Sequence, residues 1–398
     1  MKQVYIVDAV RTAVGKFSGT LSSVRPDDLG AIVIKGLIDR NPNLDVNEIE
    51  DVIFGAANQA GEDNRNVARM SALLAGLPIS VGGNTVNRLC ASGLQSIVDA
   101  SRAIQCGDGD IYISGGTESM TRAPFVMAKA ETAYSRTPEI YDTTIGWRFT
   151  NKKLSALYHP YAMGETAENV AERWNISREE QDTFAFQSQE KYQAAHAAGK
   201  FSNEIVPVHI PQKKGDPIIF NKDEHPRMSS MEDLSKLKPA FKKEGSVTAG
   251  NSSGINDGAA ALMLVSEEAL KRYNLTPLAR VVSRGVAGVD PAIMGIGPVP
   301  ASQKALKRAG LKASDLGLVE LNEAFASQSI ACMRDLALDP SIINVNGGAI
   351  AIGHPLGGSG ARISTTLIHE MQKRNVRYGL ATMCIGVGQG VALVFEKC

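Results

Sequence analysis

The chain has 398 residues, 43% hydrophobic and 21% charged, so it is long enough for two or three domains and has the composition of a globular protein. Its 42 basic residues balance 42 acidic ones with no sizeable basic tract, which argues against nucleic acid as a partner. No apolar run is long enough to span a bilayer or to act as a secretory signal. The five cysteines form no C-x-x-C pair, which argues against a disulfide framework and a zinc site. A reducing cytoplasm is therefore the expected location.

Strands and helices alternate over the first part of the chain. Strand-like apolar runs are found at residues 2–12, 50–56, 79–86 and 110–116. Helical spacing of apolar residues occurs at 27–38 and again after Gly93, where Gly107 supplies a stop.

The last part of the chain repeats this order. Helices are expected near 302–309 and across Ile363, Leu367 and Met371, and strands at 318–323, 342–346 and 378–384. Alternation of this kind predicts mostly parallel sheets covered by helices, and two such units predict a duplicated α/β core.

An insert separates the two units, at roughly 121–249. It holds both tryptophans, a proline-interrupted run at 209–217 and a polar helical stretch at 178–196. A segment of this texture predicts a lid or subdomain with a binding role.

Cys90 lies at the turn between the expected strand 79–86 and the helix after Gly93. Unpaired N–H groups and the dipole at the start of a helix favour a thiolate over a thiol, so this position predicts a nucleophile. Taken alone, a cysteine is more often a small buried hydrophobe. The remaining cysteines, apart from Cys384, are expected to pack or to lie on the surface: Cys106, Cys332 and Cys398.

Polar elements follow the expected strands at four places, namely at Cys90, 322–325, 353–355 and 384–390. Ligands of a doubly wound sheet bind outside the carboxyl ends of its strands, so we expect these elements at one edge. Each alone has an ordinary structural explanation, such as helix capping by the asparagine or a tight turn made by the glycines. Together they suit acyl chemistry, because a thiolate needs a base such as His354 and an oxyanion needs fixed N–H donors.

Two glycine-rich segments do not match nucleotide motifs. The segment 347–360 has no Gly-Lys-Ser/Thr ending, and the glycines at 386, 388 and 390 lack the dinucleotide spacing. A phosphate loop and an NAD fingerprint are therefore not indicated.

In order and along the whole chain, the segments around Cys90, 322–325, 353–355 and 384–386 resemble the motifs of the thiolase family. The resemblance implies an α/β fold with a duplicated βαβ core, two mostly parallel sheets in a five-layer αβαβα arrangement, and an inserted loop domain. The implied division has three parts: residues 1–121 with 250–274 as the N-terminal half, 122–249 as the CoA-covering loop domain, and 275–398 as the C-terminal half.

The resemblance also implies the reaction, which is acyl transfer between a cysteine thioester and CoA. A 3-oxoacyl-CoA is cleaved with CoA to acetyl-CoA and a shortened acyl-CoA, or two acetyl-CoA molecules condense to acetoacetyl-CoA in the reverse, Claisen direction. CoA enters as a substrate, and no metal or redox cofactor is implied.

Site residues are carried over from the family by position. Cys90 resembles the nucleophile that becomes acylated, and His354 the group that takes its proton and later helps to bind a thioester oxygen. Cys384 resembles the acid/base that protonates the departing acetyl-CoA carbanion. Asn322 resembles the residue that holds a water in one oxyanion hole together with His354, and the N–H groups of Cys90 and Gly386 match the second hole.

CoA-contacting positions of the family match Arg227, Ala249 and Ser253, and the acyl and pantetheine pocket matches Met163 and Phe325. Short-chain biosynthetic members can carry histidine immediately before that methionine, where this chain has alanine. The fit to an acetoacetyl-specific enzyme is weaker for that reason.

A finer likeness is to the 3-oxoadipyl-CoA thiolases of aromatic catabolism, which give succinyl-CoA and acetyl-CoA. It is carried by the runs 120–125 and 142–149, although those enzymes usually have Met-Pro-Glu-Thr where residues 163–166 are Met-Gly-Glu-Thr. The stretch that contains the runs 120–125 and 142–149 occupies the place of the family's tetramerisation loop, so a homotetramer built as a dimer of dimers is expected.

Two other classes stay open at this point. A decarboxylating ketoacyl synthase shares the architecture but needs no second cysteine, so Cys384 argues against it. A non-catalytic thiolase-like acyl carrier could keep the fold while losing reactive groups, whereas all four motifs are intact in this chain.

Overall fold

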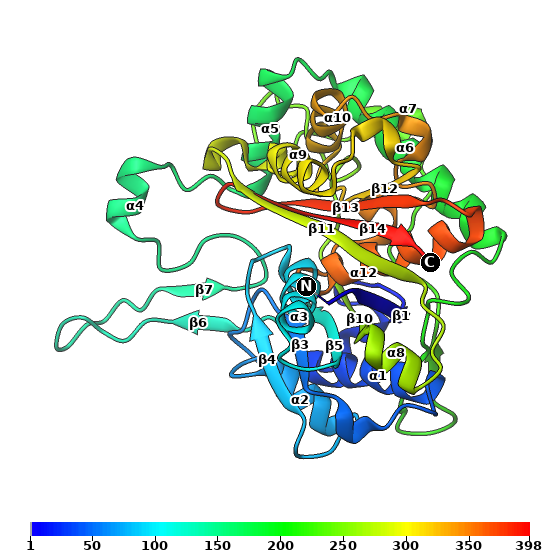
Figure 1. Ribbon diagram of the computed structural model, residues 1–398. Coiled ribbons are helices and arrows are strands. Elements are labelled where there is room, and N and C mark those ends of the chain that lie inside the picture. Colours follow the sequence, from blue (N-terminus) through cyan, green and yellow to red (C-terminus); the bar gives the residue numbers. More distant parts are fainter. Residues whose placement is uncertain (1) are drawn as a thin grey trace.

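Three helical layers enclose two strand layers in the computed structural model, which describes residues 2–398 (Figure 1). One apolar cluster joins the first outer helices to their sheet, a second surrounds the two middle helices, and a third joins the other sheet to its outer helices. The predicted five-layer αβαβα arrangement is confirmed. The outer helices are α1 (Pro26–Arg40) and α2 (Val67–Leu74) on one side and α9 (Pro298–Ala309) and α10 (Ala326–Asp335) on the other; the middle helices are α3 (Ser92–Cys106) and α12 (Leu356–Arg374).

The other elements are these. The first sheet contains β1 (Val4–Arg11), β2 (Gly15–Lys16), β3 (Asp51–Gly55), β4 (Gly82–Val86), β5 (Ile111–Ser119) and β10 (Asn256–Ser266), which is followed by α8 (Glu267–Arg272). The second contains β11 (Ala279–Gly288), β12 (Leu318–Leu321), β13 (Tyr378–Ile385) and β14 (Gln389–Lys397), and the short α11 (Ala349–Ile352) precedes α12. The insert holds β6 (Phe125–Met127), β7 (Ile140–Asp142), α4 (Lys152–Leu157), α5 (Met163–Arg173), α6 (Arg178–Ala197), β8 (Val208–Ile210), β9 (Ile218–Phe220) and α7 (Met231–Ser235).

Helix α3 shows how the sequence specifies the middle layer. Its apolar residues Leu94, Ile97 and Ile104 recur at helical spacing and are fully buried between the two sheets. Gly107 ends the helix with φ at 88°, a conformation that residues other than glycine adopt only with strain. The predicted helix and its stop are confirmed.

The sheets are mixed, so the prediction of mostly parallel sheets is wrong. Among the described strands, only β3–β4, β3–β5 and β12–β13 are parallel, while β10 runs antiparallel to β1 and β5, and β14 runs antiparallel to β11 and β13. The strands β13 and β14 form a hairpin closed by Val387 and Gly388, both with positive φ. Strand β10 is buried along its whole length and shows no alternation, so its pairing was not visible in the pattern.

The two sheets are also continuous. Strands β1 and β11 pair over two positions, Tyr5 with Arg280 and Ile6 with Ala279, and this contact joins nine strands into one path, with β2 paired to β10 beside it. The first strand of the chain therefore links the two sheets, one on each side of the middle helices.

The strand expected at 342–346 is absent from the described chain. A 3-10 turn occupies 340–342 and a single bridge joins Val319 to Ile343. Asn344 then turns to φ 44°, and its side chain pairs with the edge strand in place of a backbone: its Nδ2 donates to Leu321 O at 2.8 Å and its Oδ1 accepts from Leu321 N at 2.9 Å. A side-chain amide thus replaces one residue of a sheet ladder.

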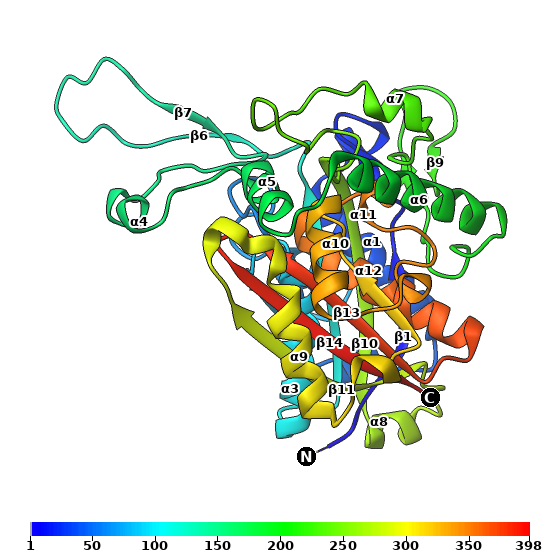
Figure 2. The ribbon, with the colours of Figure 1, turned by 90° about the horizontal axis from the view of Figure 1, so that it is seen from above.

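The insert leaves the body as a long β6–β7 hairpin, followed by α4, and both project away from the sheets in the two views (Figures 1 and 2). Its later helices, α5 and α6, return to pack against α10, and α6 also packs against α11. Among residues 2–398, no helix combines the length and the apolar character needed to cross a membrane.

Candidate active site

Cys90 lies in a tight turn between β4 and α3. Leu89 adopts φ 46°, and the turn closes where Ala91 N donates to Arg88 O at 3.1 Å. The Ser92 hydroxyl, at the start of α3, donates to Leu89 O at 2.6 Å and accepts from Arg88 N at 2.9 Å. The sulfur is therefore carried on a constrained loop directly before the helix, as the sequence predicts.

Burial favours the protonated form of the Cys90 thiol, against the thiolate that the helix start favours. Burial raises the pKa of Cys90 to about 11, and hydrogen bonds from the backbone N–H groups of Gly386 and Cys90 itself oppose that rise without cancelling it. The apolar surroundings destabilise the charged sulfur by more than these two donors and the helix start stabilise it. A base must therefore remove the proton when the sulfur attacks.

His354 is held in the loop between α11 and α12, and it does not follow a strand. The preceding Gly353 has φ 114°, and a Cβ there would lie 2.7 Å from the Asn256 side chain. That close approach lets His354 N donate to Asn256 Oδ1 at 2.9 Å. The glycine thus fixes the backbone from which the imidazole projects.

The hydrogen bonds of the His354 ring assign its tautomer. Its Nδ1 lies 2.6 Å from Ser359 Oγ, and that hydroxyl donates its own proton to Pro355 O at 3.0 Å. Ser359 must then accept from Nδ1–H, which leaves the lone pair on Nε2. Asn322 Nδ2, at 3.5 Å, faces the same Nε2 as a donor.

The imidazole is neutral near pH 7. Burial and the nearby Arg362 lower the pKa of His354 to about 3, so the titration in the neutral range expected for a lone histidine does not apply. A neutral imidazole with a free Nε2 is the form that can accept a proton.

Cys384 lies near the end of β13 in an apolar cluster with Met163 and Phe325. Burial raises the pKa of the Cys384 thiol well above its ordinary value, and a charge on Cys90 raises it further, so the two sulfurs are close enough to interact. Gly386 follows at the start of the hairpin loop, where a Cβ would lie 3.4 Å from Leu89 Cδ1 and 3.5 Å from Met163 Sδ. The structure therefore brings Cys90, Cys384 and Gly386 together.

Asn322 follows β12 and is 1% exposed. Its backbone N donates to Thr382 O at 3.0 Å, but its side-chain Oδ1 has no partner within the described residues 2–398. A buried acceptor of this kind is satisfied by a water or by a ligand. The adjacent Glu323 is structural, because its carboxylate accepts from Ser188, Asn344 and Ile350 N.

The positions matched to CoA contacts lie in the last part of the insert, at Arg227 and Ala249, and directly after it, at Ser253. Arg227 donates from Nη2 to Ala249 O at 2.8 Å, and Ser253 N donates to Ala324 O at 3.0 Å, next to Phe325. These contacts connect the two predicted CoA-contacting segments with the wall of the site that carries Asn322 and Phe325.

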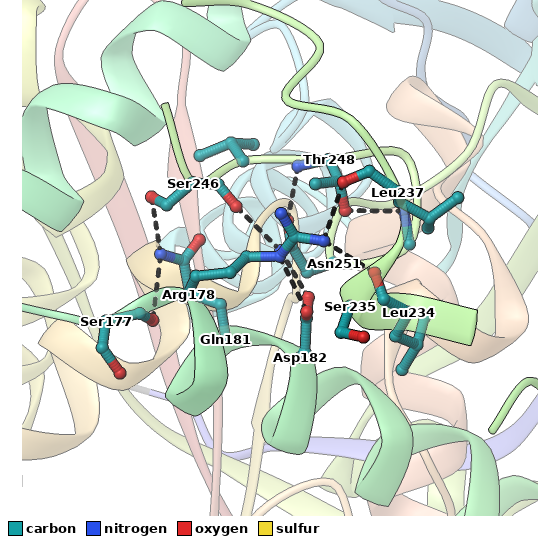
Figure 3. Close-up of polar contacts among 12 residues, drawn as sticks. Ser177, Arg178, Gln181, Asp182, Leu234, Ser235, Leu237, Ser246, Thr248 and Asn251 are labelled. Atoms are coloured by element: carbon teal, nitrogen blue, oxygen red, sulfur yellow. Dashed lines mark hydrogen bonds and ion pairs between the residues drawn. The ribbon is translucent and has the colours of Figure 1, made fainter. Parts of the chain in front are cut away.

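A polar network fixes the same loop on α6 (Figure 3). Asn251 Nδ2 donates to Asp182 Oδ1 at 2.9 Å, while its Oδ1 accepts from Thr248 N at 2.8 Å. Arg178 Nε donates to the other oxygen of Asp182 at 2.7 Å, and its Nη2 donates to Leu237 O at 3.0 Å. Ala249 and Ser253 thus lie on a segment held by buried bonds.

Three residues at the site were not singled out in the sequence, namely Ser359, Asn256 and Glu118. Glu118, at the end of β5, accepts from Ala57 N at 2.9 Å and Gly357 N at 2.7 Å, and so ties the loop after β3 to the first turn after His354. Burial raises the pKa of Glu118 to about 7. Its place at the carboxyl end of a predicted strand was the available signal.

The chain is similar to known proteins over its whole length. Residues 4–268 match the model for "Thiolase, N-terminal domain", and residues 275–397 match "Thiolase, C-terminal domain". A "Beta-ketoadipyl-CoA thiolase" of Acinetobacter baylyi is 56% identical, with 100% of each chain covered. A "3-oxoadipyl-CoA/3-oxo-5,6-dehydrosuberyl-CoA thiolase" of Escherichia coli is 54% identical, again over 100% of both chains. The crystal structure of the Bacillus anthracis acetyl-CoA acetyltransferase is similar with a TM-score of 0.94 and 42% identity, over 100% of this chain and 99% of that one.

Proposed function

The chain belongs to the thiolase family, and we propose that within this family it cleaves 3-oxoadipyl-CoA with CoA to succinyl-CoA and acetyl-CoA. It is an acyltransferase that acts on CoA thioesters. The observation that carries the substrate is the full-length identity of 56% to a protein named as a beta-ketoadipyl-CoA thiolase. The sequence led us to expect cleavage of a 3-oxoacyl-CoA or the reverse condensation of two acetyl-CoA to acetoacetyl-CoA. A preference for acetoacetyl-CoA has weaker support, since the acetyl-CoA acetyltransferases that the chain resembles are 49% and 42% identical.

In the first step proposed, Cys90 Sγ attacks the 3-oxo carbon while Nε2 of His354 takes its proton. The neutral imidazole with its Nδ1–H held by Ser359 supports this role, since Nε2 is then the ring nitrogen that carries the lone pair. The negative charge that develops on the substrate oxygen is bound by fixed donors. The backbone N–H groups of Gly386 and Cys90, which both point at the Cys90 sulfur, support one such pair.

In the second step proposed, the bond between C2 and C3 of the substrate breaks. Its electron pair stays on C2 as the enolate of acetyl-CoA, and the Cys384 thiol protonates that carbon. The high pKa of Cys384 supports an acid that is fully protonated beforehand. The succinyl group remains on Cys90 as a thioester.

In the last step proposed, CoA loses its thiol proton to the Cys384 thiolate that the second step left, and the CoA sulfur attacks the thioester carbon. Succinyl-CoA forms, and Cys90 leaves as a thiolate that takes back its proton from His354. Asn322 and His354 hold a water against the thioester oxygen in this proposal. The unpartnered Oδ1 of Asn322 beside His354 supports it, because a water needs several polar partners. Arg227, Ala249 and Ser253 are proposed to contact CoA, and Met163 and Phe325 to line the acyl and pantetheine pocket.

The division of labour between the sulfurs is tested by substitution. Cys90→Ala is expected to leave no acyl group on the protein after incubation with acetyl-CoA, as read by peptide mass mapping. Cys384→Ser is expected to be acetylated on Cys90 but to lose carbon–carbon cleavage by about 10²- to 10⁴-fold. Cys332→Ser is the matched control, since that thiol is also buried, and Cys106→Ser is an exposed one. Joint loss of both steps in Cys384→Ser contradicts the proposal.

The same assays separate the rival classes. Absence of an acetyl group on Cys90 in the unaltered chain favours the non-catalytic carrier, and malonyl-thioester turnover that survives Cys384→Ala favours a decarboxylating synthase. The substrate is tested by the ratio of kcat/KM for 3-oxoadipyl-CoA, acetoacetyl-CoA and a long-chain 3-oxoacyl-CoA. A ratio below one against acetoacetyl-CoA rejects the proposed substrate.

The division into 1–121 with 250–274, 122–249 and 275–398 is also proposed, and the pairing of β10 with β1 and β5 supports it. A homotetramer is proposed on the position of the projecting β6–β7 hairpin (Figure 2). A cytoplasmic location is proposed separately, and the five free cysteines support it. Sedimentation of the whole chain against a chain lacking residues 128–139 tests the assembly.

A further inference from the structure

The segment 142–149, which begins at the last residue of β7 and leads to α4, is anchored to the body although its neighbours project from it (Figure 1). Thr143 and Thr144 are buried, and Asp142 Oδ1 accepts from Thr144 N at 2.8 Å. Asn58, in the loop after β3, donates from Nδ2 to Thr143 O and Oγ1, both at 3.1 Å. The segment is therefore positioned by buried polar contacts.

Residues 145–150 are exposed except for Arg148, which is half-buried between Trp147 and Phe149. Its Nη2 reaches Asn58 O and Oδ1 only at 3.3 Å each. Within residues 2–398 it has no carboxylate at ion-pair distance, unlike Arg122, whose guanidinium is paired with Glu62. A guanidinium has five N–H donors, so most of the donors of Arg148 make no hydrogen bond within residues 2–398.

Two separate contacts tie this segment to the two sulfur-bearing walls. On one side, Ala57 O, next to Asn58, accepts from Asn87 Nδ2 at 3.0 Å, and Asn87 Oδ1 accepts from Leu89 N at 2.8 Å, directly before Cys90. On the other side, Trp147 Nε1 donates to Tyr161 O at 3.0 Å. Tyr161 stands two residues before Met163, which packs in the cluster of Cys384.

We propose that Arg148 binds the free carboxylate at the far end of the 3-oxoadipyl chain and so determines selectivity for a dicarboxylic acyl group. The inference rests on the proposed function, since it assigns the group that would recognise that substrate. Moving a carboxylate from water into a closed site requires a cation or several donors, and arginine meets both needs through paired N–H bonds.

Arg88, two residues before Cys90, is a second candidate cation, and its bonds argue against the same role. Its Nε donates to Gln95 Oε1 at 2.8 Å and its Nη1 donates to Gln389 Oε1 at 2.9 Å. Both bonds are short, and together they tie the Cys90 turn to the hairpin loop after Gly386. The guanidinium of Arg88 thus holds the two loops through hydrogen bonds, whereas that of Arg148 makes only the two longer contacts with Asn58.

The test compares 3-oxoadipyl-CoA with 3-oxohexanoyl-CoA, which has the same chain length and no terminal charge. For Arg148→Gln the ratio of their kcat/KM values is expected to fall by tenfold or more, mainly through the KM for 3-oxoadipyl-CoA. Arg148→Lys is expected to keep part of the preference. Arg308→Gln, a substitution on the exposed side of α9, is the matched control and keeps the ratio of the unaltered chain.

Competition between succinyl-CoA and butyryl-CoA provides a second readout that needs no turnover. Weaker binding of succinyl-CoA alone in Arg148→Gln supports the assignment. An unchanged ratio, an equal loss on both substrates, or a loss that appears in Arg88→Gln and not in Arg148→Gln overturns it. Absence of any preference in the unaltered chain instead rejects the proposed substrate, so the two failures are distinguishable.

Discussion

Ser359 Oγ and His354 Nδ1 lie 2.6 Å apart, and this contact determines which nitrogen of the imidazole can act as a base. The hydroxyl is itself bound to Pro355 O in the first turn of α12, so the ring orientation is set by the start of a buried helix. The reactive Nε2 is thereby presented to Asn322.

Ser359→Ala is expected to lower kcat by about tenfold, since one hydrogen bond that orients the base is lost, at about 1.4 kcal/mol. KM for CoA is expected to change little because the serine does not touch the predicted CoA contacts. Ser364→Ala is the control: Ser364 is buried on the same helix and makes the same kind of bond, to Gly360 O, without contacting His354. Equal losses in both variants contradict an orienting role for Ser359.

Glu118 is expected to make stability depend on pH. Its pKa is about 7 in the fold against 4.5 ordinarily, because of burial, so the folded chain holds a proton that the unfolded chain has released between these values. Stability from this group is therefore present at low pH and is lost as pH rises from about 4.5 through 7.

Glu118→Gln removes that titration. The free energy of unfolding of the variant, relative to the unaltered chain, is expected to rise between pH 5 and pH 8 in urea titrations. Glu131→Gln, in the exposed part of the β6–β7 hairpin, is expected to show no such trend. A relative stability of Glu118→Gln that stays constant over this range rejects the assignment.

Asn344→Ala is expected to destabilise the chain by about 2–4 kcal/mol, because Leu321 N and O and the Glu323 carboxylate lose buried partners. Activity is expected to fall as well, since Asn322 lies between the two residues that Asn344 holds. Differential scanning calorimetry and kcat measure the two effects. Asn375→Ala separates backbone strain from lost bonds, because Asn375 also has positive φ but is exposed at the end of α12. A comparable destabilisation in Asn375→Ala rejects the hydrogen-bond explanation.

Gly164→Ala is expected to impair the acyl pocket by overpacking, at a cost of about 1–3 kcal/mol. A Cβ at this position would lie 2.1 Å from Phe241 Cγ, and the Phe241 ring stacks edge-on against Phe325 at 6.3 Å. The departure from Met-Pro-Glu-Thr at this position therefore makes room for Phe241. KM for the acyl-CoA is expected to rise, and Phe241→Leu in the Gly164→Ala background is expected to restore it. No recovery in the double variant excludes the steric explanation.

Part of the fold and site could be predicted because the signals were local. Helix α3 follows from apolar spacing and from Gly107, and the turn that carries Cys90 follows from its place between strand and helix. The positions that were mispredicted depended on distant partners. The strand expected at 342–346 is replaced by an asparagine side chain, and strand direction depends on β10 and β14, which pair with strands far away in the chain.

The sequence by itself determined the family, because four separated motifs are readable without contacts. The resemblance to that family then implied the five-layer architecture and the candidate site residues, while apolar periodicity and glycine positions predicted single elements such as α3. Only the tertiary structure decided the protonation of those residues and the placement of Arg148. Burial, which is a property of the whole fold, turns Cys90 into a thiol and His354 into a neutral base. The contacts of Asn58 and Tyr161, from two other loops, tie the segment that carries Arg148 to the walls of the two sulfurs.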